Sequence, residues 1–338
     1  MYVMVNGLPG NMAANAAKHI IRQKDEFNFI PVSFTGPEIA EKECIVEHVP
    51  IELVRPEGRE AKIDELKALH DIIVAVDYTA DKKNPNLPRE QVEFYCSHNI
   101  PFVMGATGGK RDSPEPGADN SGTLQQRVRD SDITAVIAPN MGRQIVALQA
   151  FMEGYAREHA GKFEGYELVI IESHQKRKAD TSGTAKAMAG YFNQLGIDFK
   201  IEDIEKIRDP ELQRELGIPE EYLDAHGWHT YEIEAQGSNT PLRLFKKAVS
   251  IFLAEDKAFA DYSLNRYSGG LERISPDRTV VFQVNLEDNN RNLSMSHNVN
   301  GRDIYGLGNL GAVRFEIRKV QAGEKGIAYS MIDVMREG

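Results

Sequence analysis

The sequence predicts an α/β protein in which a Rossmann-like, doubly wound parallel sheet is joined to a second, α+β domain with a mixed or antiparallel sheet. Three observations support this prediction. Apolar segments of strand length alternate with helical segments over the first 140 residues or so. A glycine turn follows the first of these segments at Gly7. From residue 279 onward, two segments alternate apolar with polar residues, which is typical of antiparallel strands with one solvated face.

Composition limits the functional class. The 338 residues are enough for two domains, and the net charge of −11 argues against a nucleic-acid surface. No apolar segment approaches the length of a membrane span. Cys44 and Cys96 offer neither a disulfide framework nor metal-ligand spacing. Since the first strand begins at residue 2, we expect no signal or transit peptide, a cytoplasmic location, and a small-molecule partner rather than nucleic acid or membrane.

The first strand, residues 2–6, runs into a glycine turn and then a helical segment that extends to residue 22. The turn reads Gly7-Leu8-Pro9-Gly10-Asn11-Met12-Ala13. A strand, a glycine turn and a helix in this order place a dinucleotide pyrophosphate at the helix N-terminus. The pattern G-x-x-G-x-x-A is looser than the full fingerprint, so an ordinary strand–turn–helix is the alternative.

The end of the second expected strand, residues 27–34, bears on the choice of dinucleotide. An acidic residue at this place favours a ribose 2′-hydroxyl, whereas hydroxyls or cations suit a 2′-phosphate. Ser33 and Thr35 lie there, and the nearest acid, Glu38, follows Gly36-Pro37. The sequence therefore favours NADPH, with NADH possible if Glu38 folds back.

Three further strands are expected at residues 72–76, 101–104 and 133–137, each followed by small or polar residues. Because the carboxyl ends of parallel strands share one edge of a sheet, and ligands bind at that edge, these residues are candidate cofactor contacts. They are Asp77-Tyr78-Thr79, Gly105-Ala106-Thr107-Gly108 and Ala138-Pro139-Asn140-Met141. A long amphipathic helix at residues 144–159 then opens the second domain.

Residues 172–184, E-S-H-Q-K-R-K-A-D-T-S-G-T, lie between an apolar strand and a segment of good helix formers. His174 and three cations, Lys176, Arg177 and Lys178, crowd into five residues before a helix start. Cations beside a helix N-terminus form a pocket for a carboxylate or phosphate, and His174 and Lys178 can donate protons. The alternative is a solvated basic loop followed by a helix cap.

This stretch resembles the active-site signature of the 4-hydroxy-tetrahydrodipicolinate reductases (dihydrodipicolinate reductases), E-x-H-H-x-x-K-x-D-x-P-S-G-T. Gln175 replaces the second histidine and the proline before Ser182 is absent. Both departures are similar to the plant-type branch, whose motif reads E-S-H-Q…K-x-D-x-S-G-T-A-K-A. Residues 7–13, 77–79, 105–108, 138–142 and 297–302 are similar to further family motifs in the same order.

The resemblance implies a reductase of the diaminopimelate route to lysine. Such an enzyme uses NAD(P)H to convert 4-hydroxy-tetrahydrodipicolinate to tetrahydrodipicolinate, with Lys178 as proton donor, His174 as its partner and no metal. Substrate carboxylates are then expected at Gln175, Ser182, Gly183, Thr184 and Arg302. Expected cofactor contacts are Gly7, Leu8, Pro9, Gly10, Asn11, Met12, Ser33, Thr35, Asp77, Thr79, Gly105, Ala106, Thr107, Ala138, Pro139, Asn140 and Met141.

The resemblance also implies a discontinuous dinucleotide-binding domain, residues 1–141 and 303–338. Residues 142–302 form the substrate-binding, catalytic and oligomerisation domain of a dimer or tetramer. Residues 237–278 are an insertion relative to the family, with an apolar helical stripe at Val249, Phe252, Leu253 and Phe259. We predict that this stripe packs in an oligomer interface or over the site as a lid, and surface decoration is the alternative.

Two histidines and two rival functions complete the predictions. His226 and His229 are interpreted as ordinary sheet or loop histidines rather than metal ligands. Gln175 and the insertion would also suit a related nicotinamide oxidoreductase acting on another dicarboxylate or imine. A non-catalytic NADPH-binding protein is the second rival, and the presence of both His174 and Lys178 argues against it.

Overall fold

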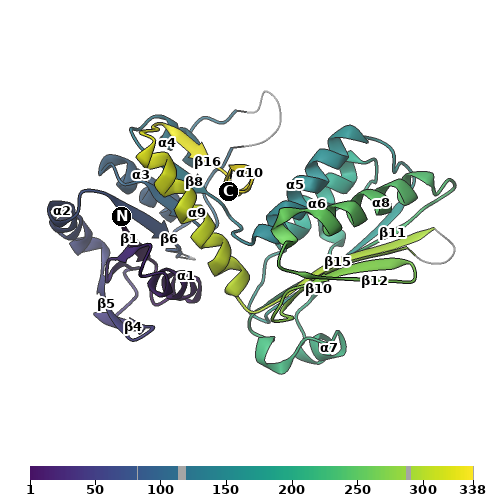
Figure 1. Cartoon of the computed structure of the whole chain (residues 1–338), viewed down its shortest axis with the longest axis horizontal. Helices are drawn as coiled ribbons and strands as arrows, with labels where there is room; N and C mark the ends of the chain where they lie inside the picture. Colours follow the sequence, from purple (N-terminus) through teal and green to yellow (C-terminus); the bar gives the residue numbers. More distant parts are fainter. Residues whose placement is uncertain (82, 113–118, 287–290, 338) are drawn as a thin grey trace. The chain divides into compact units, whose positions relative to one another are not determined.

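The computed structural model describes residues 1–81, 83–112, 119–286 and 291–337, which form two compact units (Figure 1). Unit 1 comprises Met1–Arg143 and Asp303–Gly338, and unit 2 comprises Gln144–Arg302. Each unit is built around its own large sheet. Within the described ranges, none of the helices combines the length and the apolar character that crossing a bilayer requires.

Unit 1 contains a six-stranded parallel sheet in the order β16-β8-β7-β6-β1-β2. Its strand order reverses beside β1, as expected for a doubly wound sheet, and this confirms the predicted fold class. Val3, Met4 and Val5 of β1 are fully buried because helices cover both faces. The strands are β1 (Tyr2–Asn6), β2 (Asn28–Phe29), β6 (Ile73–Asp77), β7 (Phe102–Met104), β8 (Thr134–Ile137) and β16 (Ile327–Tyr329).

The helix α9 (Asp303–Gln321) forms as expected although it contains several glycines. A Cβ atom on Gly306 would overlap His19 of α1, and one on Gly308 would overlap the carbonyl group of Met141. These two glycines therefore allow α9 to pack closely in unit 1. The other helices of this unit are α1 (Asn11–Arg22), η1 (Pro56–Gly58), α2 (Arg59–Leu69), α3 (Leu87–Ser97), α4 (Leu124–Arg129) and α10 (Met331–Glu337).

The expected second strand, residues 27–34, is divided into two. Its first part, β2, pairs with β1, whereas β3 (Val32–Phe34) pairs with β5 (Val49–Val54) in a separate sheet that also contains β4 (Glu43–Val46). Pro31 stands between β2 and β3. Because proline has no N–H group to donate, the ladder that starts at β2 ends there.

Unit 2 contains a seven-stranded mixed sheet in the order β10-β9-β11-β15-β14-β13-β12. The β9–β10 pair is parallel, and the other pairs are antiparallel. Burial alternates along β14 between buried and half-buried residues, as predicted, whereas β15 buries Met295, Ser296 and His297 in succession. The strands are β9 (Glu167–His174), β10 (Glu205–Ile207), β11 (His226–Glu234), β12 (Ser263–Tyr267), β13 (Gly270–Ile274), β14 (Val280–Leu286) and β15 (Asn292–Asn300).

Three helices lie together over one face of this sheet, namely α5 (Arg143–Glu158), α6 (Gly183–Gln194) and α8 (Thr240–Glu255) (Figure 1). Their aromatic side chains meet in the core: Phe151 of α5 stacks on Phe252 of α8 at 4.8 Å, and Phe245 of α8 lies 5.6 Å from the ring of Phe163. Shorter helical segments complete the unit: η2 (Ile201–Asp203), α7 (Pro210–Glu215), η3 (Glu220–Tyr222) and η4 (Lys257–Phe259).

The prediction that the apolar stripe of the insertion packs on a partner or over the site is wrong. Residues 237–278 supply α8, η4, β12 and β13, and the stripe closes the core of unit 2 itself. Val249 and Phe259 are fully buried there, and Phe252 and Leu253 are nearly so. The insertion is therefore not surface decoration either, because it provides both a covering helix and a hairpin of the sheet.

Candidate active site

The signature stretch begins at the end of β9 and continues through a loop into α6. At its centre lies Glu172, whose side chain is completely buried. Arg208 donates from Nη2 to Oε1 of Glu172 at 2.6 Å, and the backbone N–H of Ser182 lies 3.3 and 3.2 Å from the two carboxylate oxygens. His174 Nδ1 lies 2.9 Å from Oε2. Three segments of the chain thus meet on one carboxylate.

Electrostatics keep this carboxylate ionised. Burial raises the pKa of Glu172, but the hydrogen bonds and charge interactions that it makes with His174 and Arg208 outweigh burial and lower this pKa to about 2. Glu172 is therefore an acceptor at neutral pH and holds its partners in place. The Nδ1 side of the His174 ring faces this carboxylate, a contact that becomes an ion pair when the ring is protonated, and the Nε2 side is left for chemistry.

Arg208 ties the loop to the sheet. It follows β10, which runs parallel to β9 with Lys206 opposite Glu172, and this register delivers the guanidinium to the carboxylate. Arg208 Nε also donates to the carbonyl oxygen of Lys178 at 2.8 Å, and Arg208 Nη2 donates to the carbonyl oxygen of Asp180 at 3.4 Å. One side chain therefore fixes both the loop backbone and the central carboxylate.

A row of side chains crosses the sheet beneath α6. Glu172 on β9 is in register with His229 on β11, His229 with His297 on β15, and His297 with Phe282 on β14. The rings of His229 and His297 stack at 4.5 Å, and His229 Nε2 lies 3.0 Å from Ser182 Oγ. Burial lowers the pKa of His229 well below its usual value and that of His297 to about 3, so both rings are neutral.

His174 has room because its cross-strand partner is a glycine. Gly227 lies opposite His174, and a Cβ atom there would lie 3.3 Å from His174 Nε2. The His174 ring meets His229 edge-on at 5.1 Å. His226, in contrast, bonds to Ser173 Oγ at 3.0 Å and to the carbonyl oxygen of Tyr222 at 2.9 Å. The interpretation of His226 as a structural histidine fits these contacts, whereas His229 belongs to the site.

Among the residues that the structure describes, Lys178 differs from the other two cations of the basic cluster because its side chain forms an ion pair. Its Nζ donates to both carboxylate oxygens of Asp180 at 3.0 Å, and one fifth of its side chain is exposed. Lys176 and Arg177 are exposed on the loop surface. The backbone N–H of Lys178 donates to the carbonyl oxygen of Gln175 at 2.9 Å. The alternative of a solvated basic loop therefore describes two of the three cations.

The expected carboxylate-binding residues are only partly brought together. Ser182 caps α6 by accepting from the N–H of Ala185 at 3.5 Å, and the exposed Gly183 begins the helix. Arg302 follows β15 and donates to the carbonyl oxygen of Asp224 at 3.1 Å. Thus Gln175, Ser182, Gly183 and Thr184 lie with His174 and Lys178 in the one stretch that runs from the end of β9 to the start of α6. The guanidinium of Arg302 is held by another part of unit 2.

A metal ion fits this cluster poorly. Glu172, His174 and His229 each offer a ligand atom within 4.8 Å of the others, the one such group in the parts of the chain that the structure describes. However, Arg208 and the N–H of Ser182 already occupy the carboxylate, and the guanidinium would repel a cation. We therefore interpret the cluster as a hydrogen-bonded network that orients His174.

The glycine turn of unit 1 fits a dinucleotide pyrophosphate. Gly7 has φ of 98°, and a Cβ atom there would lie 2.7 Å from the carbonyl carbon of Tyr78, so only glycine fits. Pro9, Gly10 and Asn11 are exposed, and the first turn of α1 has neither a side-chain cap nor an acidic residue. Its N–H groups can therefore bind phosphate oxygens.

Ser33 and Thr35 are occupied in the structure. The N–H of Leu8 donates to Ser33 Oγ at 3.2 Å, and Thr35 Oγ1 donates to the carbonyl oxygen of Leu8 at 2.7 Å. Both side chains are buried and hold the glycine turn. Glu38 folds back so that its carboxylate lies against Gly36, where a Cβ atom would overlap it. The hydroxyls on which the NADPH preference was based are therefore committed elsewhere, and an acid lies at the strand end.

The remaining expected cofactor contacts line the carboxyl ends of β6, β7 and β8. Asp77 is fully buried and accepts from Tyr95 Oη at 2.5 Å and from the N–H of Thr79 at 2.7 Å, so its side chain supports this edge from within. Burial raises the pKa of Asp77. Thr107 and Pro139 are exposed, and Asn140 is half-buried, whereas side chains at the other expected positions are buried: Thr79, Ala106, Ala138 and Met141.

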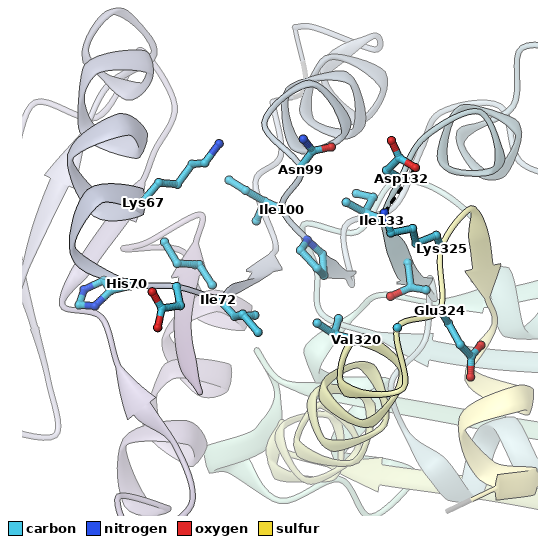
Figure 2. A pocket seen from close by; sticks show the side chains of 15 residues that line it. Lys67, His70, Ile72, Asn99, Ile100, Asp132, Ile133, Val320, Glu324 and Lys325 are labelled. Atoms are coloured by element: carbon cyan, nitrogen blue, oxygen red, sulfur yellow. Dashed lines mark ion pairs between the residues drawn. The ribbon is translucent and has the colours of Figure 1, made fainter.

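A cavity of about 420 Å³ lies at the opposite edge of the same sheet (Figure 2). It is lined by the amino ends of β6, β7 and β8 at Ile73, Pro101 and Thr134, together with Lys67 and Lys325. Ligands of parallel α/β sheets bind outside the carboxyl ends of the strands. This cavity is therefore not the expected dinucleotide site.

Sequence reasoning missed Arg208 and gave His229 no function. Neither residue belongs to the recognised motifs, and each reaches the site through strand register. Their only local signal was that each lies next to or within an expected strand. His297 was recognised as part of the motif at residues 297–302, but no role was given to it. Glu172 likewise appeared only as the first letter of the signature.

Comparison with known proteins identifies the relatives of this chain. Residues 145–335 match the family model described as "Dihydrodipicolinate reductase, C-terminus". The chain is 33% identical over 337 residues to a probable 4-hydroxy-tetrahydrodipicolinate reductase 2 of Oryza sativa subsp. japonica, a match that covers 99% of this chain and 83% of the relative. It is also 33% identical to 4-hydroxy-tetrahydrodipicolinate reductase 1 of Arabidopsis thaliana, over 99% of this chain and 78% of the relative. A bacterial reductase from Janthinobacterium is 26% identical over 55% of this chain and 62% of the relative.

The plant relatives correct the expected location. The names of four plant relatives place those proteins in the chloroplast, which contradicts the prediction of a cytoplasmic protein. The prediction was based on a first strand that begins at residue 2 and on Cys44 and Cys96, which offer no disulfide framework. Neither observation distinguishes the cytoplasm from a plastid.

Proposed function

The chain belongs to the family of 4-hydroxy-tetrahydrodipicolinate reductases, and from this premise we propose that it reduces 4-hydroxy-tetrahydrodipicolinate to tetrahydrodipicolinate in the diaminopimelate route to lysine. One substrate molecule, one reduced nicotinamide dinucleotide and one proton give product, oxidised dinucleotide and water. The observation that carries this proposal is the stretch at residues 174–183, where His174 contacts the buried carboxylate of Glu172 and Lys178 lies in the loop that leads to the N-terminus of α6.

Lys178 supplies the proton in this proposal. The nicotinamide dinucleotide, when bound, supplies the hydride. Lys178 is paired with the exposed Asp180, and an exposed pair of this kind contributes only about 0–1 kcal/mol. A substrate carboxylate can therefore replace Asp180 at low cost and bring the ammonium group to the substrate. His174, held by Glu172, accepts or donates a hydrogen bond on its Nε2 side as the partner of Lys178.

The N-terminus of α6 binds one substrate carboxylate. Ser182 offers a hydroxyl, and the N–H groups of Gly183 and Thr184 begin a helix of 12 residues whose first turn contains no acidic side chain. Gln175 adds a neutral hydrogen-bonding group from the same loop. Arg302 is assigned to the second carboxylate, which requires its guanidinium to leave the carbonyl oxygen of Asp224.

The two units have separate roles in the proposal. Unit 1 binds the dinucleotide at Gly7–Met12 and at the carboxyl ends of β6, β7 and β8, and unit 2 binds the substrate and forms a homodimer or homotetramer. Support for oligomer formation comes from the face of the unit 2 sheet opposite the helices, where the side chains of Val169 and Tyr267 are exposed. The edge strand β12 adds to this support, because each of its residues is exposed. Sedimentation analysis measures the oligomeric state, and a monomer would contradict this part of the proposal.

The nicotinamide cofactor is proposed to be either NADPH or NADH, with Glu38 limiting the use of the phosphorylated form. The hydroxyls of Ser33 and Thr35 hold the backbone of Leu8, so they do not select a 2′-phosphate. A carboxylate at this strand end accepts a hydrogen bond from a 2′-hydroxyl and repels a phosphate. Initial rates with both dinucleotides measure the preference.

The catalytic assignment is tested with Lys178→Met, which removes the charge and keeps most of the volume. Turnover of enzymatically generated substrate should fall by about 10²–10⁴, the usual range for one positioned acid, whereas the dissociation constant for NADPH should not change. Lys176→Met removes an exposed lysine of the same loop and is the matched control. Parent-level turnover by Lys178→Met would refute the assignment, and turnover of a different cyclic imine alone by the parent would identify a related oxidoreductase instead.

A further inference from the structure

His229 lies between the buried row of the sheet and the helix that is proposed to bind substrate. Its Nε2 lies 3.0 Å from Ser182 Oγ, the hydroxyl at the N-terminus of α6. Its Nδ1 is buried and, among the residues that the structure describes, has no hydrogen-bond partner. The ring is held between His297 on one side, stacked at 4.5 Å, and His174 on the other, edge-on at 5.1 Å. It therefore has one polar contact and little freedom to rotate.

The single contact determines which nitrogen carries the proton. A neutral imidazole has one N–H group and one acceptor nitrogen. If Nδ1 carried the proton, a buried N–H would have no acceptor, which folded proteins rarely tolerate. If Nε2 carries it, the N–H donates to Ser182 Oγ and only a lone pair is left at Nδ1. The packing therefore favours the Nε2–H form.

This tautomer changes what Ser182 can offer to a ligand. Its oxygen then accepts from two donors, His229 Nε2 and the backbone N–H of Ala185 at 3.5 Å. Both acceptor positions of the hydroxyl are filled, so its own hydrogen is left to donate. A carboxylate oxygen is an acceptor only and matches such a hydroxyl, whereas the NH₂ group of a carboxamide would meet a second donor.

We propose that His229 is a positioning and specificity-determining residue that donates to Ser182 Oγ and thereby commits the Ser182 hydroxyl to donate to a substrate carboxylate. The inference rests on the proposed function, because it assumes that a cyclic dicarboxylate binds at the N-terminus of α6. The low pKa of His229, caused first by burial and then by neighbouring positive groups, keeps the ring neutral, so this role does not change with pH.

Two substitutions separate this role from simple packing. His229→Gln places an amide nitrogen near the position of Nε2, whereas His229→Asn places it near Nδ1. With NADH bound, affinity for pyridine-2,6-dicarboxylate and for its monoamide is measured by calorimetry. We expect His229→Asn to raise the dissociation constant of the dicarboxylate about tenfold or more and to reduce the preference over the monoamide. His229→Gln should stay within about threefold of the parent, and kcat should change less than KM in both variants.

If His229 acts as proposed, its substitution lowers dicarboxylate affinity only by changing the hydrogen bonding of Ser182. On a Ser182→Ala background, His229→Asn should add no further loss, because the hydroxyl that it orients is gone. Long-range ¹H–¹⁵N spectra of the parent should assign the His229 proton to Nε2, a measurement that needs neither activity nor a folded variant. A proton on Nδ1, or equal dicarboxylate affinity in parent, Gln and Asn variants, would overturn the inference.

Failure of the proposed function gives a different result. A parent protein that neither turns over 4-hydroxy-tetrahydrodipicolinate nor binds pyridine-2,6-dicarboxylate would refute both the proposed function and this assignment of His229. An active parent whose KM is unchanged by His229→Asn would refute only the inference. An active parent with raised KM in His229→Asn, normal KM in His229→Gln and Nε2–H in the spectra would support both.

Discussion

Arg208→Met should destabilise unit 2 far more than the loss of an ordinary surface ion pair. The substitution keeps an unbranched side chain of similar length and removes the guanidinium. It deletes the 2.6 Å bond to Oε1 of the buried Glu172 and the 2.8 Å bond to the carbonyl oxygen of Lys178. Glu172 would then retain only His174 and the N–H of Ser182 as partners, although its own side chain is fully buried.

The expected magnitude follows from the Glu172 pKa. Its partners lower this pKa from 4.5 to about 2 against the effect of burial. A difference of that size corresponds to about 3 kcal/mol, and removal of one member of a buried pair costs about 3–5 kcal/mol. We therefore expect a loss of about 3 kcal/mol in the free energy of unfolding at pH 7. A depressed carboxyl pKa stabilises above pH 4.5, so this difference should shrink as the pH falls from 4.5 toward 2.

Trp228, the only tryptophan in the chain, lies on β11 and reports on unit 2. Its fluorescence during urea unfolding measures both variants against the parent. Arg214→Met is the matched control, because Arg214 makes two bonds of 2.7 and 3.0 Å to Glu220 in an exposed pair, and its loss should change stability far less than the loss of Arg208. Equal losses for Arg208→Met and Arg214→Met would refute the reasoning.

Two further predictions concern unit 1. Glu38→Gln should raise the kcat/KM ratio of NADPH over NADH about tenfold, because a carboxylate that repels a 2′-phosphate is removed; an unchanged ratio would exclude Glu38 as the selecting residue. Glu316 is buried on α9, where Thr134 Oγ1 donates to it at 2.5 Å, and burial raises its pKa to about 8. The unfolded chain releases this proton near pH 4.5 and the folded chain only near pH 8, so parent stability should fall between these values. Glu316→Gln should lack that decline in thermal unfolding measured at pH 5 and pH 8, and parallel curves would contradict the assignment.

Apolar segments of strand length and apolar residues at helical spacing were enough to predict the elements that form without an interruption. The strand at residues 72–76 forms in the centre of its sheet, and residues 303–321 form α9 at the expected bounds. The strand expected at 27–34 shows where periodicity fails: its apolar character is continuous, but Pro31 divides its hydrogen bonding between two sheets. The prediction for residues 237–278 was wrong for another reason: an apolar stripe on a helix does not show which surface will cover it.

The candidate site was predictable only where it is local in the chain. His174, Gln175, Lys178 and Ser182 lie within nine residues, so a motif could find them together. Arg208 arrives through the parallel pairing of β10 with β9, and His229 through the antiparallel pairing of β11 with β9. Register is set by the whole buried face of a sheet, since a slip of one residue would turn every side chain to the other face. No local pattern around Arg208 or His229 carries that information.

The central carboxylate explains why residues from separate segments had to converge. An unpaired charge in a buried position is so costly that Glu172 can remain ionised only if donors surround it. Arg208 from the end of β10, the N–H of Ser182 at the start of α6 and His174 at the end of β9 meet this need. The same donors define the shape of the loop that carries Lys178. Among the described residues, Lys178 itself forms no hydrogen bond with the Glu172 carboxylate and bonds to Asp180 instead. Loop shape and proton donation therefore depend on different side chains, so substitutions at Arg208 should affect stability first, and substitutions at Lys178 turnover alone.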